Sequence, residues 1–393
     1  MLTRAGWTTL VLAVAAVGAG RLLGLQELYV LATMAVALCA VSLVAVRRSP
    51  HLHVDRLVVP SRVHVGSASR IELRVRNGGR RSSPVVTLFE PVQGTVGAEV
   101  SVAPLRAGDG HGATYRLPTE RRGTIRIGPL EAQRLDPFGL ARRRSVVTEA
   151  TRLTVLPAVE VLRGVPVLGG LDDPLAGVAR HTLGARGSGD FSSLRPYVPG
   201  DDLRRVHWAS TARAGDLLVR QDDPPWQGHL TVLLDLDPAR LDAERFERAV
   251  SAVASTIAAA AASGDRVRLL DTSGTDTGLV DARSALDPLL ERLATVQRAE
   301  RPGVTPPLVE DRSANGALVA ATGTPDRAFA ELVDRLAERF GTVIVFAFGD
   351  ADGPDVEPAG AAGGLGRASR IWEAVPDDRP FPAAWGEALA RAR

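Results

Sequence analysis

Two long apolar runs at the start of the chain limit what this part can fold into. The first covers residues 6–20 and continues past Arg21 to Leu25, and the second covers residues 28–46 without a charged residue. A helix that spans a bilayer needs about 20 mainly apolar residues. Both runs reach that length if Arg21 extends its charged end to the interface. The short connection leaves room only for a tight turn, so the pattern predicts a transmembrane helical hairpin over residues 1–48.

Two other interpretations of these runs stay open. The first run has features of a cleaved signal peptide, because Arg4 precedes an apolar stretch that ends in small residues. The runs could also be core helices, although their length and their lack of a polar face argue against this.

Arginines flank the hairpin unevenly. Arg4 precedes the two runs and only Arg21 lies between them. Several arginines follow them: Arg47, Arg48, Arg56 and Arg62. The positive-inside rule then predicts that both ends of the hairpin, and the chain after His51, lie in the cytoplasm. We therefore expect a multi-pass protein of the cell membrane with its soluble domains in the cytoplasm.

Composition excludes some classes of protein. Hydrophobic residues make up 45% and charged residues 23% of the 393 residues, which is typical of globular domains and long enough for two or three of them. The net charge of +2 provides no basic stripe, so nucleic acid is not an expected partner. With Cys39 as its single cysteine, the chain cannot form an internal disulfide, which suits the cytoplasm.

Residues 49–165 have the pattern of a β-sandwich. Residues 70–76 alternate strictly between polar and apolar side chains and stop at Asn77-Gly78-Gly79, as in a half-buried strand that ends in a turn. Similar short runs cover residues 85–89, 114–117, 124–127 and 153–156. Their spacing predicts an immunoglobulin-like domain.

A run of arginines, Arg142-Arg143-Arg144, follows an Asp-Pro-Phe-Gly turn at residues 136–139. Such a run is most often a solvated loop, and that is our prediction. The alternative is a contact with lipid head groups.

Residues 228–393 alternate between apolar runs and helical periods. Predicted strands cover residues 228–235, 266–270, 317–321, 342–348 and 370–375, and predicted helices cover 241–262, 284–297, 325–340 and 383–390. Alternation of this kind predicts a doubly wound α/β sheet.

Residues 166–227 link the two domains and hold an unusual density of charged, aromatic and turn residues. The candidate site residues here are Arg195, Tyr197, Pro199, Gly200, Asp201, Asp202, Arg204, Arg205, His207, Trp208, Arg213, Gly215 and Arg220. Arginine forks and carboxylates of this kind can form a salt-bridge clamp between domains. Tyrosine, tryptophan and arginine are also the types that dominate docking surfaces. Both interpretations stay open.

Residues 189–220 resemble, almost position for position, the signature of the bacterial domain of unknown function 58 family, and the Asp-Pro-Phe-Gly turn is similar to the one that commonly ends the family's β-region. The resemblance implies a von Willebrand factor A-like C-terminal domain. In such domains the first strand ends in an Asp-x-Ser-x-Ser motif that binds a divalent cation. Asp235 matches its first position, whereas Asp237 and Ala239 stand at the two serine positions.

The altered motif implies at most a weak Mg²⁺ site at Asp235 and Asp237, and no other cofactor, because alanine supplies no oxygen ligand. The alternative is two acidic residues at a strand end, without a metal. Thr272 and Thr277 are loose candidates for the later motif positions.

Members of this family are commonly encoded near MoxR-type AAA+ ATPases and transglutaminase-like membrane proteins. The resemblance therefore implies a membrane-anchored scaffold or adaptor that faces the cytoplasm and acts with such an ATPase in the assembly or maturation of protein complexes. A metal-dependent adhesion or binding module is the alternative.

A hydrolase is a more remote alternative. Ser192, Ser193, Asp201 and His207 include the residue types of a hydrolytic triad. No Gly-x-Ser-x-Gly elbow accompanies them, so we expect no enzymatic activity.

Overall fold

The computed structural model describes residues 1–47, 52–166, 191–197, 206–222, 229–301, 316–349 and 369–392. The chain divides into two compact units, Met1–Ala158 and Val159–Arg393. The first holds two helices and a β-sandwich, and the second holds an α/β sheet.

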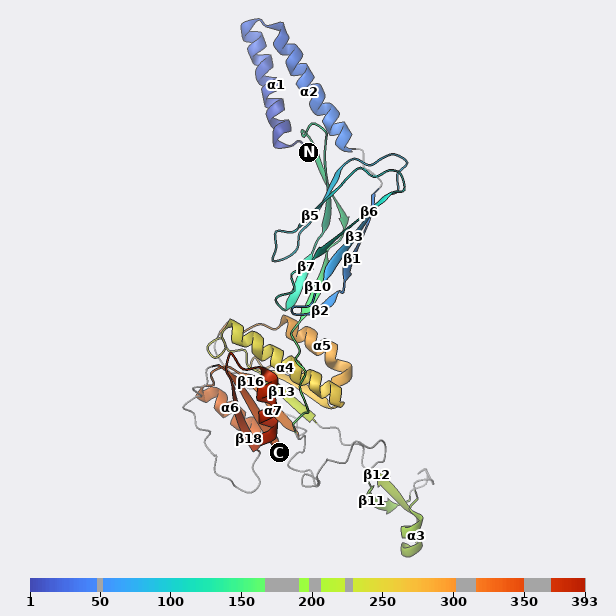
Figure 1. The fold of residues 1–393 in the computed structure, drawn as a ribbon, viewed down its shortest axis with the longest axis vertical. Helices are drawn as coiled ribbons and strands as arrows, with labels where there is room; N and C mark the ends of the chain where they lie inside the picture. Colours follow the sequence, from blue (N-terminus) through green and yellow to red (C-terminus); the bar gives the residue numbers. More distant parts are fainter. Residues whose placement is uncertain are drawn as a thin grey trace. The chain divides into compact units, whose positions relative to one another are not determined.

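The first unit begins with two apolar helices that lie side by side, α1 (Arg4–Leu23) and α2 (Gln26–Arg47) (Figure 1). Thr3 caps α1, because its Oγ1 accepts a hydrogen bond from Gly6 N at 3.0 Å. Gly24 ends α1 with a φ of 68°. Both helices are long and apolar enough to cross a membrane, and only 17% and 22% of their most apolar windows are buried. This low burial argues against the interpretation as core helices.

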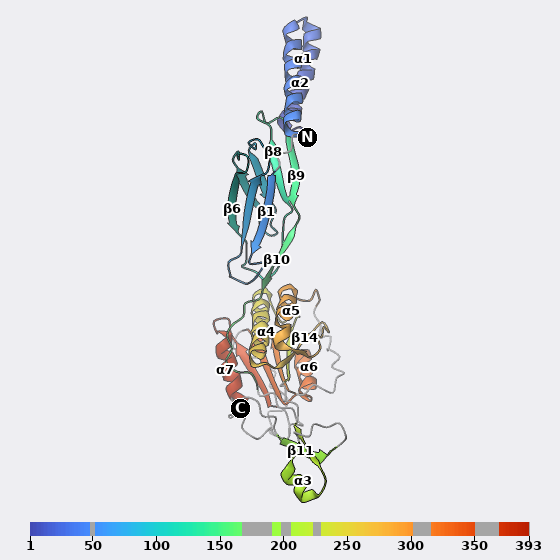
Figure 2. The ribbon, with the colours of Figure 1, turned by 90° about the vertical axis from the view of Figure 1, so that its right-hand side faces the viewer.

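The strands of the first unit form three sheets, ordered β1-β3-β6, β2-β10-β7 and β5-β4-β8-β9. Their bounds are β1 (Leu52–Val59), β2 (Arg62–His64), β3 (Arg70–Asn77), β4 (Val86–Glu90), β5 (Ala98–Val102), β6 (Gly110–Arg116), β7 (Gly123–Ile127), β8 (Leu130–Leu135), β9 (Arg142–Thr148) and β10 (Thr151–Leu156). Figure 2 shows β1 and β6 in one layer and β8 and β9 in another.

One apolar core joins these sheets. Alternate residues of strands from all three sheets enter it, as the period of two requires, and they include Ile71 and Leu73 of β3, Leu88 of β4 and Leu153 of β10. The predicted strands are present. The prediction of a loop at Arg142-Arg143-Arg144 is wrong, because these residues begin β9 and pair with β8.

A buried ion pair crosses this core, and no sequence pattern had indicated it. The Arg56 guanidinium of β1 contacts the Glu90 carboxylate of β4, with 4% and 1% of the two side chains exposed. The Tyr115 hydroxyl of β6 donates to the other Glu90 oxygen. Burial, followed by the hydrogen bond to Glu90, raises the pKa of Tyr115. Gly128 approaches so closely that a Cβ there would lie 2.7 Å from Arg56 Nη1.

The second unit is built on a six-stranded sheet with the order β15-β14-β13-β16-β17-β18. The strands are β13 (His229–Leu234), β14 (Arg266–Asp271), β15 (Val280–Asp281), β16 (Ala317–Thr322), β17 (Thr342–Phe348) and β18 (Ser369–Val375). The helices are α4 (Ala243–Ser263), α5 (Ala282–Thr295), α6 (Arg327–Ala337) and α7 (Phe381–Arg391). All pairings are parallel except β14 with β15 at the edge. The predicted alternation of strands and helices is present, with ends that differ by a few residues.

Helices cover both faces of this sheet. Val343 and Val345 of β17 share a core with Phe329 of α6. Phe346, which points to the opposite face, stacks on Trp385 of α7 at 5.8 Å between ring centroids. Figure 2 shows α6 and α7 on opposite sides of the sheet. The polar residues of the candidate site lie at the carboxyl ends of these strands.

Candidate functional site

The central strand β13 ends at the point where the order of the sheet reverses. Strand β13 lies between β14 and β16. The two strands that follow it in the chain, β14 and β15, lie on one side of it, and the later strands β16, β17 and β18 lie on the other side. In open α/β sheets, ligands bind at this switch point, outside the carboxyl ends of the strands. Three polar residues stand there: Asp235 directly after β13, Thr272 directly after β14, and Thr322 at the end of β16.

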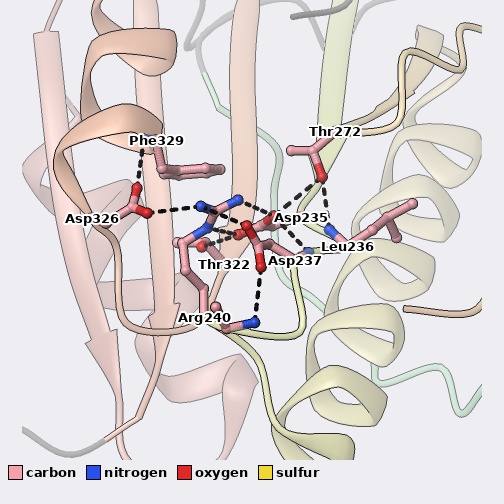
Figure 3. A network of polar contacts seen from close by, with 9 residues as sticks. Asp235, Leu236, Asp237, Arg240, Thr272, Thr322, Asp326 and Phe329 are labelled. Carbon is pink, nitrogen blue, oxygen red and sulfur yellow. Dashed lines mark hydrogen bonds and ion pairs between the residues drawn. The ribbon is translucent and has the colours of Figure 1, made fainter. Parts of the chain in front are cut away.

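The guanidinium of Arg240 lies at the centre of this site (Figure 3). Its Nε donates to Asp235 Oδ2 at 2.7 Å and its Nη2 donates to Asp235 Oδ1 at 3.0 Å. This is the paired geometry that makes arginine–carboxylate contacts strong. The third nitrogen, Nη1, lies 3.0 Å from Asp237 Oδ2 and 3.0 Å from Asp326 Oδ2. Arg240 therefore contacts all three carboxylates.

Neutral donors saturate the Asp235 carboxylate. The Thr322 hydroxyl donates to Oδ2 at 2.6 Å, and the Thr272 hydroxyl donates to Oδ1 at 3.2 Å. The backbone N–H of Asp237 donates to Oδ1 at 3.1 Å. Because Asp235 is 0% exposed, this set of donors is what makes its burial as an anion tolerable.

The local backbone brings Arg240 back over Asp235. The amides of Arg240 and Leu241 both donate to the carbonyl of Asp237, at 3.2 and 3.0 Å, which closes a turn directly after β13. Gly323 is required opposite this turn, because a Cβ there would overlap the carbonyl oxygen of Arg240. The Phe329 ring lies beneath the guanidinium, 5.4 Å from its central carbon, in a cation–π position.

Charge keeps the arginine protonated. Burial lowers the pKa of Arg240, but the hydrogen bond and charge of Asp235 and the charges of Asp237 and Asp326 outweigh burial and raise it overall. The side chains of Arg240 and Asp237 are each 3% exposed, whereas that of Asp326 is 54% exposed. A permanent monocation thus lies among the carboxylates, where a divalent cation would have to bind. Among the described residues, no group of three or more His, Cys, Asp or Glu side chains is arranged to hold a metal ion.

The structure brings some of the candidate residues together. Asp235, Asp237 and Thr272 meet in one cluster, but Thr277 lies outside it, where its Oγ1 accepts from Leu269 N at 2.9 Å. Sequence analysis missed three members of the cluster: Arg240, Thr322 and Asp326. Asp326 had a usable signal, since it precedes a helix and caps α6 by accepting from Phe329 N at 2.9 Å.

The signature segment forms a small motif of its own. Strand β11 (Phe191–Pro196) pairs antiparallel with β12 (Leu218–Asp222), and the short helix α3 (Trp208–Ala214) precedes β12. Arg195 lies in β11 and Arg220 in β12. Tyr197 is half-buried, and its amide donates to Leu217 O at 2.8 Å. The antiparallel pair fixes the two ends of the signature beside each other.

His207 acts as the cap of α3. Its Nδ1 accepts from Ser210 N at 3.3 Å and lies 2.9 Å from Ser210 Oγ. Gly215 ends the helix with a φ of 80°. Trp208 is 64% exposed, and Arg213 is also exposed.

Other candidates of this segment lie outside the described residues, namely Pro199, Gly200, Asp201, Asp202, Arg204 and Arg205. The clamp and the docking surface therefore stay predictions.

Comparison with known proteins bears on this second unit. The family model described as "Protein of unknown function DUF58" matches residues 193–345, which confirms the resemblance of the signature. Among curated proteins, no match to the chain is found.

Solved structures give only distant likenesses. The CARDB domain of a Pyrococcus furiosus protein in complex with di-metal ions is 19% identical, with a TM-score of 0.22, over 27% of this chain and 93% of that one. The β-glucosidase EmGH1 from Erythrobacter marinus is 17% identical, with a TM-score of 0.19, over 27% and 16%. The DNA glycosylase AlkC from Pseudomonas fluorescens, bound to DNA containing an abasic site analog, is 10% identical, with a TM-score of 0.20, over 30% and 33%. TM-scores this low carry no argument about the fold. The fold is assigned from the strand orders of the sheets described above.

Proposed function

Because residues 193–345 place this chain in the DUF58 family, we propose that it is a membrane-anchored scaffold or adaptor that faces the cytoplasm. Its α/β unit is a von Willebrand A-like domain that works without a bound metal. A MoxR-type AAA+ ATPase is its partner in the assembly or maturation of protein complexes, and a transglutaminase-like membrane protein is a second partner.

The contact of Arg240 with Asp235 carries this proposal. A metal-dependent module must leave ligand positions open for the cation and for the partner's carboxylate. Here the guanidinium binds Asp235 through two nitrogens at 2.7 and 3.0 Å. A single arginine thus supplies the positive charge, and the site stabilises the loops at the carboxyl edge of the sheet.

Two observations support the von Willebrand A-like assignment. Counted from β13 in chain order, the sheet reads 3-2-1-4-5-6, with an antiparallel edge strand. Asp235 ends the first of these strands, which is the position of the first aspartate in the cation motif.

The membrane anchor is supported by α1 and α2, whose lengths of 20 and 22 residues match the thickness of a bilayer. Arg4 and Arg47 lie at one end of the pair, and Arg21 lies in the last turn of α1 at the other end. This asymmetry favours a cytoplasmic position for both units.

A docking role for the signature is supported by Trp208, a large apolar side chain that is 64% exposed at the start of α3. Exposed tryptophans are enriched among residues that dominate binding energy. Trp208 is therefore the first residue to test in a complex with the ATPase.

The test is co-elution of the full-length, detergent-solubilised chain with a purified MoxR-type ATPase in size-exclusion chromatography. We expect a complex that Trp208→Ala weakens by about 2 kcal/mol or more, the threshold of a hot spot. Val96→Ala is the matched control, because Val96 is 96% exposed in a turn of the sandwich. Failure of the wild-type chain to bind the ATPase would refute this partnership.

The two alternatives are less well supported. A metal-dependent module would require a cation to displace Arg240 from three carboxylates. A hydrolase would require His207 as the base, yet its Nδ1 is engaged with Ser210 in the cap of α3.

A further inference from the structure

We propose that the tip of the β8–β9 hairpin and the adjoining ends of α1 and α2 form a surface that binds anionic phospholipid head groups. This surface, here termed the collar, consists of Arg4, Arg47, Leu135, Phe138 and Arg142. It rests on the proposed function in one respect, since α1 and α2 must lie in a bilayer.

The hairpin tip is fastened to the first turn of α1. Thr3 donates from its backbone amide to Leu140 O at 2.8 Å and from its hydroxyl to Gly139 O at 2.6 Å. The approach is so close that a Cβ on Gly6 would overlap the carbonyl oxygen of Leu140. The tip therefore lies beside the first turn of α1, at the start of the apolar span.

The hairpin is also fastened to the last turn of α2. Arg143 Nη1 donates to Arg47 O at 2.8 Å, and Arg134 Nη2 donates to Ala45 O at 3.2 Å. The last carbonyls of a helix have no partners within it and carry partial negative charge, so two arginines from a neighbouring strand pair suit them. These contacts fix the hairpin against both helices.

The strand register decides which side chains remain free for lipid. Arg134 lies opposite Arg143, and Leu135 lies opposite Arg142. Directly opposed residues share a face of a sheet, and successive residues point to opposite faces. Arg134 and Arg143 face α2, so Leu135 and Arg142 point to the other side. There Leu135 is 54% exposed.

Aromatic side chains mark the depth of the collar. Trp7, in the first turn of α1, is 59% exposed, and Phe138, at the hairpin tip, is 57% exposed. Tryptophan concentrates at membrane–water interfaces, and phenylalanine and leucine are apolar residues that interfacial segments insert at the head-group boundary. Because the tip is hydrogen-bonded beside the first turn of α1, Phe138 and Trp7 lie at the same end of the helix pair, as an interfacial belt requires.

Charge selects the kind of lipid. Arg4, Arg47 and Arg142 are exposed at this end of the helices, and the one carboxylate of the tip, Asp136, is buried and accepts from Ala141 N and Phe138 N. Basic residues next to a spanning helix are attracted to anionic leaflets. Phospholipid is favoured over a protein partner because the arginines surround the helix ends that enter the bilayer.

The first experiment measures the depth of the tip. The full chain with Cys39→Ala receives a single cysteine by Phe138→Cys or, as the control, by Val96→Cys. Each is labelled with an environment-sensitive fluorophore and reconstituted into nanodiscs that contain phosphatidylglycerol. We expect a blue-shifted emission from position 138 that lipids with a shallow nitroxide quench, and an aqueous emission from position 96.

The outcomes separate this inference from the proposed function. If alkaline carbonate extracts the wild-type chain from membranes, α1 and α2 do not anchor it, and the proposed function itself is refuted. A chain that resists extraction, but whose label at position 138 reports water, would refute the collar alone. A label that is shielded but not quenched by lipid nitroxides would indicate burial against protein, either within the chain or against a second copy of it, and would also overturn the proposal.

The second experiment measures head-group selection. Lipids that co-purify from mixed phosphatidylcholine and phosphatidylglycerol discs are quantified for wild type and for the triple variant Arg4→Gln, Arg47→Gln and Arg142→Gln. We expect enrichment of phosphatidylglycerol that falls by about fivefold or more in the variant, since each basic residue at an anionic surface contributes a factor of about five. The control triple replaces exposed arginines of the same sandwich, Arg116, Arg126 and Arg152, by glutamine. Equal loss in both triples would refute a specific collar.

Discussion

Arg240 places a fixed positive charge among Asp235, Asp237 and Asp326, so its removal leaves the buried carboxylates of Asp235 and Asp237 without their cation. We expect Arg240→Ala to lower the free energy of unfolding by about 3–5 kcal/mol, as when one partner of a buried ion pair is lost. Thermal unfolding of the detergent-solubilised chain measures this. Arg327→Ala is the control: Arg327 also pairs with a carboxylate, that of Glu331, but is 90% exposed and should contribute less than about 1 kcal/mol.

The same variant tests the role of the arginine as a substitute for a metal. Without the guanidinium, nothing balances the negative charge of Asp235, Asp237 and Asp326, and their side chains would be left to rearrange with the two threonine hydroxyls around a cation that prefers hard oxygen donors, such as Mg²⁺ or Mn²⁺. We expect millimolar Mg²⁺ or Mn²⁺ to raise the unfolding midpoint of Arg240→Ala but not that of the wild type. Calorimetry of the wild-type chain should show no affinity tighter than roughly millimolar. Micromolar binding by wild type, abolished by Asp235→Ala, would instead favour the metal-dependent module.

The ion pair inside the sandwich is a second test at single residues. Glu90→Ala leaves the Arg56 guanidinium buried without its carboxylate, and we expect a loss of about 3–5 kcal/mol. Tyr115→Phe removes only one donor to Glu90 and should cost about 1–2 kcal/mol. Glu72→Ala, which breaks the exposed pair with Arg70, is the control for both. Equal stability of the Glu90 and Glu72 variants would mean that the buried pair contributes nothing.

Among the elements, the β8–β9 hairpin depends on the ionisation of Asp136. Burial raises the pKa of this carboxyl, but hydrogen bonds from the backbone N–H groups of Ala141 and Phe138 outweigh burial and hold it below its usual value. A folded-state pKa below the unfolded one gives stabilisation that is complete above the unfolded value, near pH 4, and is lost as pH falls through the folded value.

We therefore expect the difference in unfolding midpoint between wild type and Asp136→Asn to be constant from about pH 6 to 8 and to shrink below about pH 4. Thermal scans at each pH measure it. Asp55→Asn, at an exposed position of β1, corrects for general acid effects. A difference that persists unchanged at low pH would contradict the role given to the Asp136 carboxylate.

Elements with a local signature were predictable from the sequence. The alternation over residues 70–76 matched β3 (Arg70–Asn77), and the apolar run over residues 342–348 matched β17 within the same bounds. Strand β9 was missed, because its first residues are three arginines whose pairing with β8 and contacts with α2 are long-range. Backbone pairing with β8 makes these residues a strand, and Arg143 adds a side-chain hydrogen bond to the end of α2.

The candidate site was predictable in part for the same reason. Asp235 and Asp237 stand out at the end of an apolar strand, and Thr272 follows the next strand. The chain has 47 basic residues, and no sequence signal set Arg240 apart from the others. Its role comes from the turn after β13 and from the approach of Gly323, and both depend on the finished sheet.

For the whole molecule, the arrangement of charges around α1 and α2 determines which side of a membrane the two units occupy. Arg4 and Arg47 flank one end of the helix pair, and Arg134 and Arg143 of the sandwich bind the carbonyls at that same end. The turn at Gly24 has only Arg21 nearby. Moving the whole sandwich across the bilayer would require this arginine-rich end to cross as well, which the positive-inside rule disfavours.

We therefore expect a reporter fused after Arg48 to be active only as a cytoplasmic reporter, and one inserted at Gly24 to be active only outside the cytoplasm. Paired fusions to a fluorescent protein that folds in the cytoplasm and to a phosphatase that needs an oxidising compartment give opposite readouts at each position. Arg21→Ala is the control for charge in the turn and should leave the orientation unchanged, because it removes the arginine next to the turn and keeps Arg4 and Arg47 at the other end. Phosphatase activity after Arg48 would reverse the proposed orientation, and a mature chain that lacks α1 would identify the first run as a cleaved signal peptide.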